Sequence, residues 1–153
     1  MFNSQPGTYA IVLRCTDEDR ITIGRLGDFQ LRKGHYIYVG SAFGAGGVRA
    51  RVIRHYSGGK ARYWHIDYLT EHISLVEAWY THDPERREHC WVDVMTRMNL
   101  VPCKKGFGSS DCGCYSHLFH VTARPKVSLF RRAITRQVGG HHQIDVWIPP
   151  RVG

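Results

Sequence analysis

The sequence has no long hydrophobic run and no leader-like start. No apolar stretch approaches the roughly 20 residues that a helix needs to cross a bilayer. The first residues, MFNSQPG, lack the basic and apolar regions of a secretory signal. We therefore expect a soluble, cytoplasmic protein with no membrane partner.

Acidic residues are also scarce relative to basic ones. Thirteen Asp and Glu stand against 21 Lys and Arg, which gives a formal net charge of +8 with ten His held neutral. A charge of this sign favours a polyanionic partner such as nucleic acid. A ribosomal or membrane-surface role would give the same balance, so charge alone does not decide between them.

Cysteines number only five, an odd count in a chain of 153 residues. A chain of this length can bury a hydrophobic core without disulfides, so reduced intracellular thiols are the simpler interpretation. There is no internal repeat and no low-complexity tract. Together these features predict one globular domain.

The order of apolar segments predicts an α+β fold. Residues 8–15 and 35–42 are apolar and rich in β-formers, and residues 19–31 alternate as in a hairpin. We expect them to begin a small central antiparallel sheet as a three-stranded meander, with Tyr9 and Tyr38 on neighbouring strands. Further strands are expected at residues 73–80 and 144–148.

Helices are predicted to flank this sheet, over residues 46–57, 63–72, 83–100 and 127–138. The third has a clear start signal, with Asp83 as N-cap, Pro84 at the first helical position and Glu85 in the first turn. Residues 1–122 would form the main domain, and residues 123–153 a C-terminal extension packed on it.

Two short tyrosine motifs, Gly-Thr-Tyr ending at Tyr9 and Tyr-Val-Gly beginning at Tyr38, are candidates for chemistry. A phenolic oxygen can take or give a proton. The alternative is that both rings only pack, as aromatic residues in strands commonly do.

The helix predicted at residues 46–57 carries an apolar stripe of Val48, Val52, Ile53 and Tyr56. Arg51 and His55 flank this stripe one turn apart, where the helix would meet the sheet. An Arg there can hold a phosphate bidentately. The alternative is a solvated basic face, which Arg49 and Arg54 would continue.

Glu88 would share a helix face with apolar residues if that helix begins at Pro84. A carboxylate at the head of an apolar face needs a partner, and a hard divalent cation is one. The alternatives are a helix-dipole role and three rival acids: Glu71, Glu77 and Glu85.

This ordered set resembles the GIY-YIG nuclease superfamily, and the runs WHIDYL and GFGSSDCGCYSHLF are similar to its branch catalogued as domain of unknown function 123. The resemblance implies a GIY-YIG-like fold. It also implies a divalent-metal-dependent endonuclease that hydrolyses phosphodiester bonds in DNA, or in RNA, during repair, recombination or processing. The alternative is a nucleic-acid-binding module that keeps the fold without cleavage.

The resemblance also implies roles for five residues. Tyr9 would act as general base or orient the attacking water, with Tyr38 beside it. Arg51 would stabilise charge on the phosphorus centre, and Glu88 would hold one Mg²⁺ or Mn²⁺. His55 and Tyr38 would maintain the network or supply the leaving-group proton.

Contacts with nucleic acid are expected from small, basic and imidazole side chains near these segments: Gly40, Ser41, Arg49, Arg54, Lys60, Arg62, His65, Lys104, Lys105 and His117. Asp111 could support the metal, while His65 or His117 could contact phosphate or protonate a leaving oxygen. Asp67, Ser110 and Ser116 also match the branch, without assigned roles.

Cys112, Cys114 and His117 raise the question of a zinc site. Structural zinc sites space their cysteines two to four residues apart and need four ligands. Only one residue separates these two cysteines, and Cys90 and Cys103 would have to complete the set. A polar loop with buried thiols is therefore the preferred interpretation.

Overall fold

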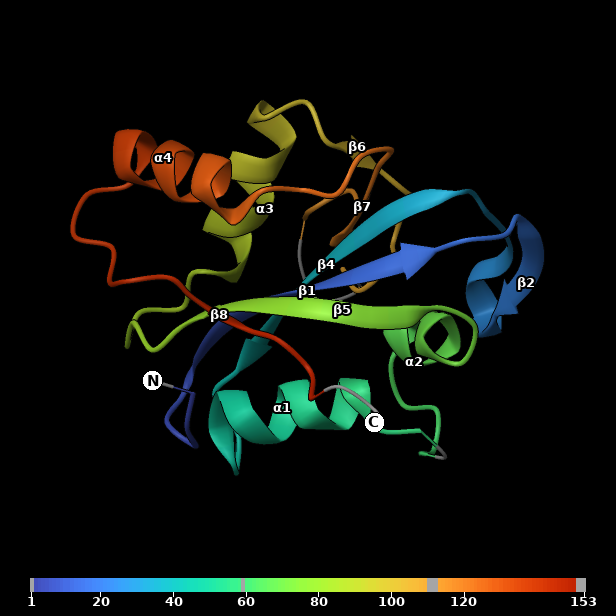
Figure 1. Cartoon of the computed structure of the whole chain (residues 1–153), viewed down its shortest axis with the longest axis horizontal. Coiled ribbons are helices and arrows are strands. Elements are labelled where there is room, and N and C mark those ends of the chain that lie inside the picture. The colour runs from blue at the N-terminus through green and yellow to red at the C-terminus, as the bar shows by residue number, and fades with distance from the viewer. Residues whose placement is uncertain (1, 59, 110–112, 151–153) are drawn as a thin grey trace.

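The computed structural model describes residues 2–58, 60–109 and 113–150 and has the predicted α+β fold, with helices on both faces of an antiparallel sheet (Figure 1). The order of the main sheet is β6-β7-β4-β1-β5-β8. Its strands are β1 (Gly7–Cys15), β4 (Gly34–Ala42), β5 (Ser74–Thr81), β6 (Val101–Pro102), β7 (Leu118–Val121) and β8 (Asp145–Trp147). A second sheet pairs β2 (Asp19–Ile23) with β3 (Gly27–Leu31) through the 3₁₀ turn Gly24–Leu26. The helices are α1 (Gly47–Tyr56), α2 (His65–Thr70), α3 (Glu88–Arg97) and α4 (Val127–Gln137).

Strand β1 is buried on both faces, which explains its almost continuous apolar sequence. Helices α1 and α2 cover one face of the sheet, and α3 and α4 cover the other (Figure 1). Ile11 and Leu13 belong to the core beneath α1 and α2, whereas Ala10 and Val12 belong to the core beneath α3 and α4. Each fully buried Leu, Ile or Val contributes about 1.5–3 kcal/mol. No helix in the described part of the chain is long and apolar enough to cross a bilayer.

The register of β1 and β4 places the two tyrosine motifs side by side. Tyr9 pairs with Gly40, and Ile11 pairs with Tyr38, so both phenol rings project from the same face of adjacent strands. The predicted three-stranded meander is wrong in one respect, because β1 pairs directly with β4 and no strand of the hairpin lies between them. The hairpin β2–β3 leaves the main sheet and forms its own, burying its apolar side in the core beneath α1 and α2.

Helix α3 begins at Glu88, and the predicted start after Asp83 is wrong. The carboxylate of Asp83 accepts hydrogen bonds from the backbone N–H of Glu85 at 2.9 Å, from Nε of Arg87 at 3.1 Å and from the backbone N–H of His142 at 3.1 Å. Its partners therefore lie in the turn just before α3 and in the distant segment around His142. Asp83 therefore fixes the entry to α3 from outside the helix.

The C-terminal segment joins the same sheet and core. Strand β8 pairs with β5, and α4 packs against α3. The ring of Phe130 stacks on Trp79 at a centroid separation of 5.3 Å and meets the edge of Trp91 at 4.9 Å. Residues 127–147 thus complete the core beneath α3 and α4.

Candidate active site

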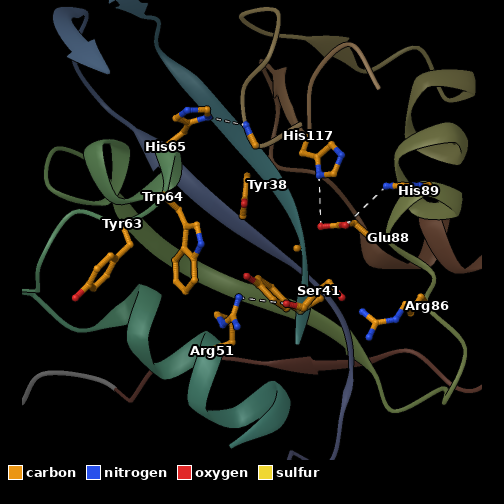
Figure 2. Close-up of a pocket in the computed structure, with 13 residues that line it drawn as sticks. Tyr38, Ser41, Arg51, Tyr63, Trp64, His65, Arg86, Glu88, His89 and His117 are labelled. Carbon is orange, nitrogen blue, oxygen red and sulfur yellow. Dashed lines mark hydrogen bonds and ion pairs between the residues drawn. The ribbon is translucent and has the colours of Figure 1, made fainter. Parts of the chain in front are cut away.

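A pocket of about 480 Å³ opens where β1, β4, α1, α3, the start of α2 and the loop before β7 meet (Figure 2). Eight predicted site residues line it: Tyr9, Tyr38, Gly40, Ser41, Arg51, His65, Glu88 and His117. These residues come from separate segments of the chain, so the fold itself gathers them.

Tyr9 lines the pocket and is hydrogen-bonded to His55. The Tyr9 hydroxyl is 2.7 Å from Nε2 of His55, and the two side chains are 1% and 2% exposed. Burial raises the pKa of Tyr9 well above its ordinary value, with Tyr38 adding to the rise and Arg51 opposing it. Burial also lowers the pKa of His55 to about 3, so its imidazole is neutral at physiological pH.

The glycine of the second motif makes room for the tyrosine of the first. A Cβ atom on Gly40 would lie 2.3 Å from the Tyr9 hydroxyl oxygen. Gly108 plays a similar part for Tyr38, because a Cβ there would lie 2.9 Å from Cε1 of that ring, and its φ of +66° already favours glycine. Both phenols are therefore positioned by close contact with backbone.

Arg51 reaches into the pocket from α1. Its Nη1 donates to the backbone carbonyl of Ser41 at 3.3 Å, and its guanidinium lies 4.4 Å from the centroid of the Trp64 ring (Figure 2). Arg51 also interacts with the Tyr9 hydroxyl, and a guanidinium with five N–H donors still has donors left for a ligand. Since Arg51 has no ion pair among the residues that the structure describes, it can bind a phosphate without breaking one there.

Arg54, by contrast, is engaged within the fold. It donates to both carboxylate oxygens of Asp67, at 2.7 and 3.0 Å, and its guanidinium lies 4.3 Å from the Trp64 ring centroid. Burial raises the pKa of Asp67, but Arg54 and the backbone N–H groups of Trp64 and Tyr63 outweigh it and hold the pKa below its ordinary value. This cluster fixes Trp64 at the rim of the pocket.

Glu88 faces the pocket from the first turn of α3, the position that the helix dipole favours for an acid. Its Oε2 lies 3.4 Å from Nδ1 of the buried His117, and its Oε1 lies 4.0 Å from Nε2 of His89 (Figure 2). Among the described residues it is the one carboxylate that lines the pocket. One carboxylate beside open space fits Mg²⁺ or Mn²⁺, because Mg²⁺ keeps several waters and uses few protein ligands.

The structure also gathers nitrogen and sulfur donors next to Glu88. One ligand atom each from His89, Cys114 and His117 lies within 4.8 Å of the other two. The cluster includes neither Cys90 nor Cys103, which the sequence offered as partners. Cys112, like Ser110 and Asp111, lies outside the described residues.

The remaining predicted nucleic-acid contacts lie outside the pocket lining. Arg49 and Lys105 are exposed. Arg62 forms an exposed ion pair with Glu71 at 2.6 Å. Lys60 and Lys104 donate to backbone carbonyls, the former to Ser57 at 2.6 Å and the latter to Asp28 at 3.2 Å.

Five residues that line the pocket were not predicted from the sequence: Tyr63, Trp64, Arg86, His89 and Gly108. Two aromatic residues beside the basic run that ends at Arg62 were a usable signal for a surface that stacks on bases or cations. His89 could have been found as the neighbour of Glu88. Arg86 gave no sequence signal, because only the turn fixed by Asp83 brings it to the pocket.

Comparison with protein families matches residues 8–139 to a family described as a domain of unknown function, DUF123. The chain belongs to this family. The match includes every predicted site residue and extends through α4. Comparison with curated proteins and with solved structures finds no match.

Proposed function

We propose that this DUF123 protein is a cytoplasmic endonuclease of the GIY-YIG type, which hydrolyses phosphodiester bonds in DNA with the help of Mg²⁺ or Mn²⁺. Repair, recombination or processing of DNA is the setting that such an activity suggests, and RNA is the alternative substrate. The observation that carries the proposal is the convergence of Tyr9, Tyr38, Arg51 and Glu88 on one pocket.

The Tyr9–His55 pair supplies a route for the proton of an attacking water. Because the pKa of Tyr9 is raised, its phenol is protonated at neutral pH and cannot act as a preformed phenolate. It can accept the proton of water only as it gives its own proton to a partner. The neutral Nε2 of His55, 2.7 Å away, is that partner. We therefore assign the base function to the pair.

Arg51 would bind the scissile phosphate and stabilise the charge that develops on it. Its guanidinium is oriented by Trp64 and by the carbonyl of Ser41, so little reorganisation is needed on binding. Arg86 lies across the pocket, has no ion pair in the described part of the chain, and could hold a neighbouring phosphate (Figure 2).

Glu88 would hold the divalent ion at the pocket wall. Such an ion, when bound, would withdraw charge from the phosphate oxygens and increase the acidity of a water. Burial is the main cause that raises the pKa of Tyr9 and of Tyr38, and the negative charge of the nearby Glu88 adds to the rise in both. Neutralising that charge would therefore make the proton transfer through Tyr9 easier.

A binding module without cleavage is the second candidate, and the same pair of residues favours it. Neither Tyr9 nor His55 is a ready base at neutral pH, since burial keeps the phenol of Tyr9 protonated and lowers the pKa of His55 to about 3. A phenol and an imidazole held in this way could simply close the core beneath a phosphate-binding pocket.

Cleavage of defined DNA substrates tests the proposal. The purified protein with Mg²⁺ or Mn²⁺ should nick at least one of a panel of duplex, flap, junction and single-stranded DNAs. Chelator and the substitution Glu88→Gln should each abolish nicking, whereas Glu85→Gln, a matched change at an exposed acid beyond the pocket lining, should not. Activity that persists in chelator or in Glu88→Gln would contradict the metal-dependent mechanism. Tight binding without nicking in either metal would favour the binding module.

A further inference from the structure

Three side chains near Glu88, two of which line the pocket, carry donor atoms that Mg²⁺ does not use. His89, Cys114 and His117 each place one nitrogen or sulfur within 4.8 Å of the other two. In a tetrahedral zinc centre, metal–ligand bonds of about 2.0–2.3 Å put the ligand atoms roughly 3.5 Å apart. Closing the cluster around an ion thus requires side-chain movements of about 1 Å.

We propose that His89, Cys114 and His117 bind one transition-metal ion of the zinc class, with a fourth position open to the pocket. Imidazole nitrogen and thiolate sulfur select Zn²⁺, or Co²⁺ as its spectroscopic substitute, over Mg²⁺ and Ca²⁺. Three protein ligands with one open position are typical of catalytic zinc centres, whereas structural centres have four. The inference concerns the pocket of the proposed nuclease but does not depend on cleavage.

The charges of the cluster suit a divalent cation. A thiolate on Cys114 and the neighbouring carboxylate of Glu88 bring two negative charges, and the imidazoles of His89 and His117 bind metals in their neutral form. A divalent ion therefore makes the group neutral, which suits a site whose His117 is only 2% exposed. Glu88, with Oε2 3.4 Å from Nδ1 of His117, also occupies the place of the carboxylate that commonly orients a metal-binding imidazole.

The backbone holds two of the ligands in place before any ion binds. The N–H of His117 donates to Phe107 at 2.9 Å, and its carbonyl accepts from Val39 of β4 at 3.0 Å. His89 is fixed in the first turn of α3. The two imidazole rings already lie edge to face, with centroids 5.9 Å apart. This arrangement favours binding, because the backbone of both residues is already ordered and only side chains have to adjust.

The test is metal retention by the full chain. The protein is stripped with chelator, incubated with Zn²⁺ or Mg²⁺, desalted and analysed for metal content. We expect about one Zn²⁺ per chain, no retained Mg²⁺ and a higher melting temperature with Zn²⁺. Loading with Co²⁺ should give a thiolate-to-cobalt charge-transfer band, which reports directly on the cysteine.

Matched variants identify the ligands. Cys114→Ser and His89→Gln should each weaken Zn²⁺ binding by at least about 100-fold, and Cys114→Ser should abolish the cobalt band. Cys103→Ser and His72→Gln change the same residue types away from the pocket and should leave binding unchanged. His89 is 62% exposed, so its variant should fold normally.

Two results would overturn the site: no retained Zn²⁺, or retention that both ligand variants leave unchanged. Cleavage is measured separately in Mg²⁺ and Mn²⁺. A chain that retains zinc but cuts no DNA supports this site and contradicts the nuclease proposal. A chain that cuts DNA in Mg²⁺ but retains no zinc contradicts this site alone.

Discussion

The hydroxyl of Tyr9 and Nε2 of His55 are 2.7 Å apart, and this contact joins the first strand of the sheet to the last turn of α1. In the described part of the chain, Nδ1 of His55 has no hydrogen-bond partner. The imidazole thus depends on Tyr9 for its one polar contact inside the core. Removing the polar group of either residue is therefore expected to leave the other without this hydrogen bond.

Tyr9→Phe should separate catalysis from packing. The ring remains, so the variant should lose about 1–3 kcal/mol of stability, from a hydrogen bond and an unpaired imidazole nitrogen. If Tyr9 accepts the proton of water, turnover should fall by about 100-fold or more while DNA affinity stays nearly constant. Single-turnover cleavage and equilibrium binding measure the two effects.

Tyr36→Phe is the matched control for this variant. Tyr36 is a buried tyrosine of β4 that also has a hydrogen bond, 2.9 Å from the backbone N–H of Arg32, and it does not line the pocket. Its variant should lose similar stability and no turnover. Equal activity of Tyr9→Phe and Tyr36→Phe would mean that Tyr9 only packs.

His55 makes stability depend on pH in a specified direction. Its pKa is about 3 in the folded chain and about 6.5 when unfolded, so only the unfolded chain binds the proton between these values. Stability should therefore fall as pH is lowered from about 6.5 toward 3, by about 1.4 kcal/mol per pH unit from this group. Chemical denaturation at a series of pH values, compared with His55→Gln, isolates the effect. Parallel curves for the two proteins would contradict the assignment.

Gly40→Ala should disturb the pocket through Tyr9. The added Cβ would lie 2.3 Å from the hydroxyl oxygen, so the ring must move, at a cost of about 1–3 kcal/mol. Gly139→Ala, where nothing lies within 4 Å of the new atom, is the control. In a Tyr9→Ala background the Gly40 change should cost much less, since the clashing ring is gone. Equal costs in both backgrounds, measured by denaturation, would show that another contact is responsible.

Most strands and helices could be predicted from sequence because their patterns are local. The start of α3 could not, since Asp83 uses its carboxylate on the distant backbone of His142. The buried face of α1 was also misjudged. Tyr56, predicted in the apolar stripe, is 37% exposed, and His55 is buried because Tyr9 offers it a hydrogen bond.

The candidate site could be predicted where the motif residues lie on regular elements, as Tyr9, Arg51 and Glu88 do. The roles of the individual arginines could not be predicted, because a charge pattern does not show which Arg forms an ion pair within the fold. Arg54 and Arg51 look alike in the sequence, yet Arg54 is paired with Asp67, whereas Arg51 has no carboxylate partner in the described part of the chain. That difference arises only when α1 and α2 pack together.

Asp67→Ala should destabilise the fold strongly. Its side chain is 1% exposed and accepts from Arg54 and from the backbone N–H groups of Tyr63 and Trp64. Removing one partner of a buried pair leaves the other uncompensated, which typically costs about 3–5 kcal/mol. Glu71→Ala, at an ion pair whose members are both exposed, should change the free energy of unfolding much less. Similar losses of unfolding free energy in the two variants would mean that the buried contacts of Asp67 do not stabilise the fold.

The salt dependence of DNA binding should reveal which cations contact phosphate. Arg86 lines the pocket, lies over the ring of Phe43 at 4.5 Å and has no ion pair in the described part of the chain. Each lost phosphate contact should reduce the slope of log K against log salt by about 0.9 for duplex DNA. Arg86→Ala should therefore flatten the slope by about that amount and weaken binding to all sequences alike. Arg132→Ala, an exposed change on α4 outside the pocket, should leave the slope unchanged. A larger effect of Arg132 would place the nucleic acid against α4, away from the pocket of Tyr9 and Glu88.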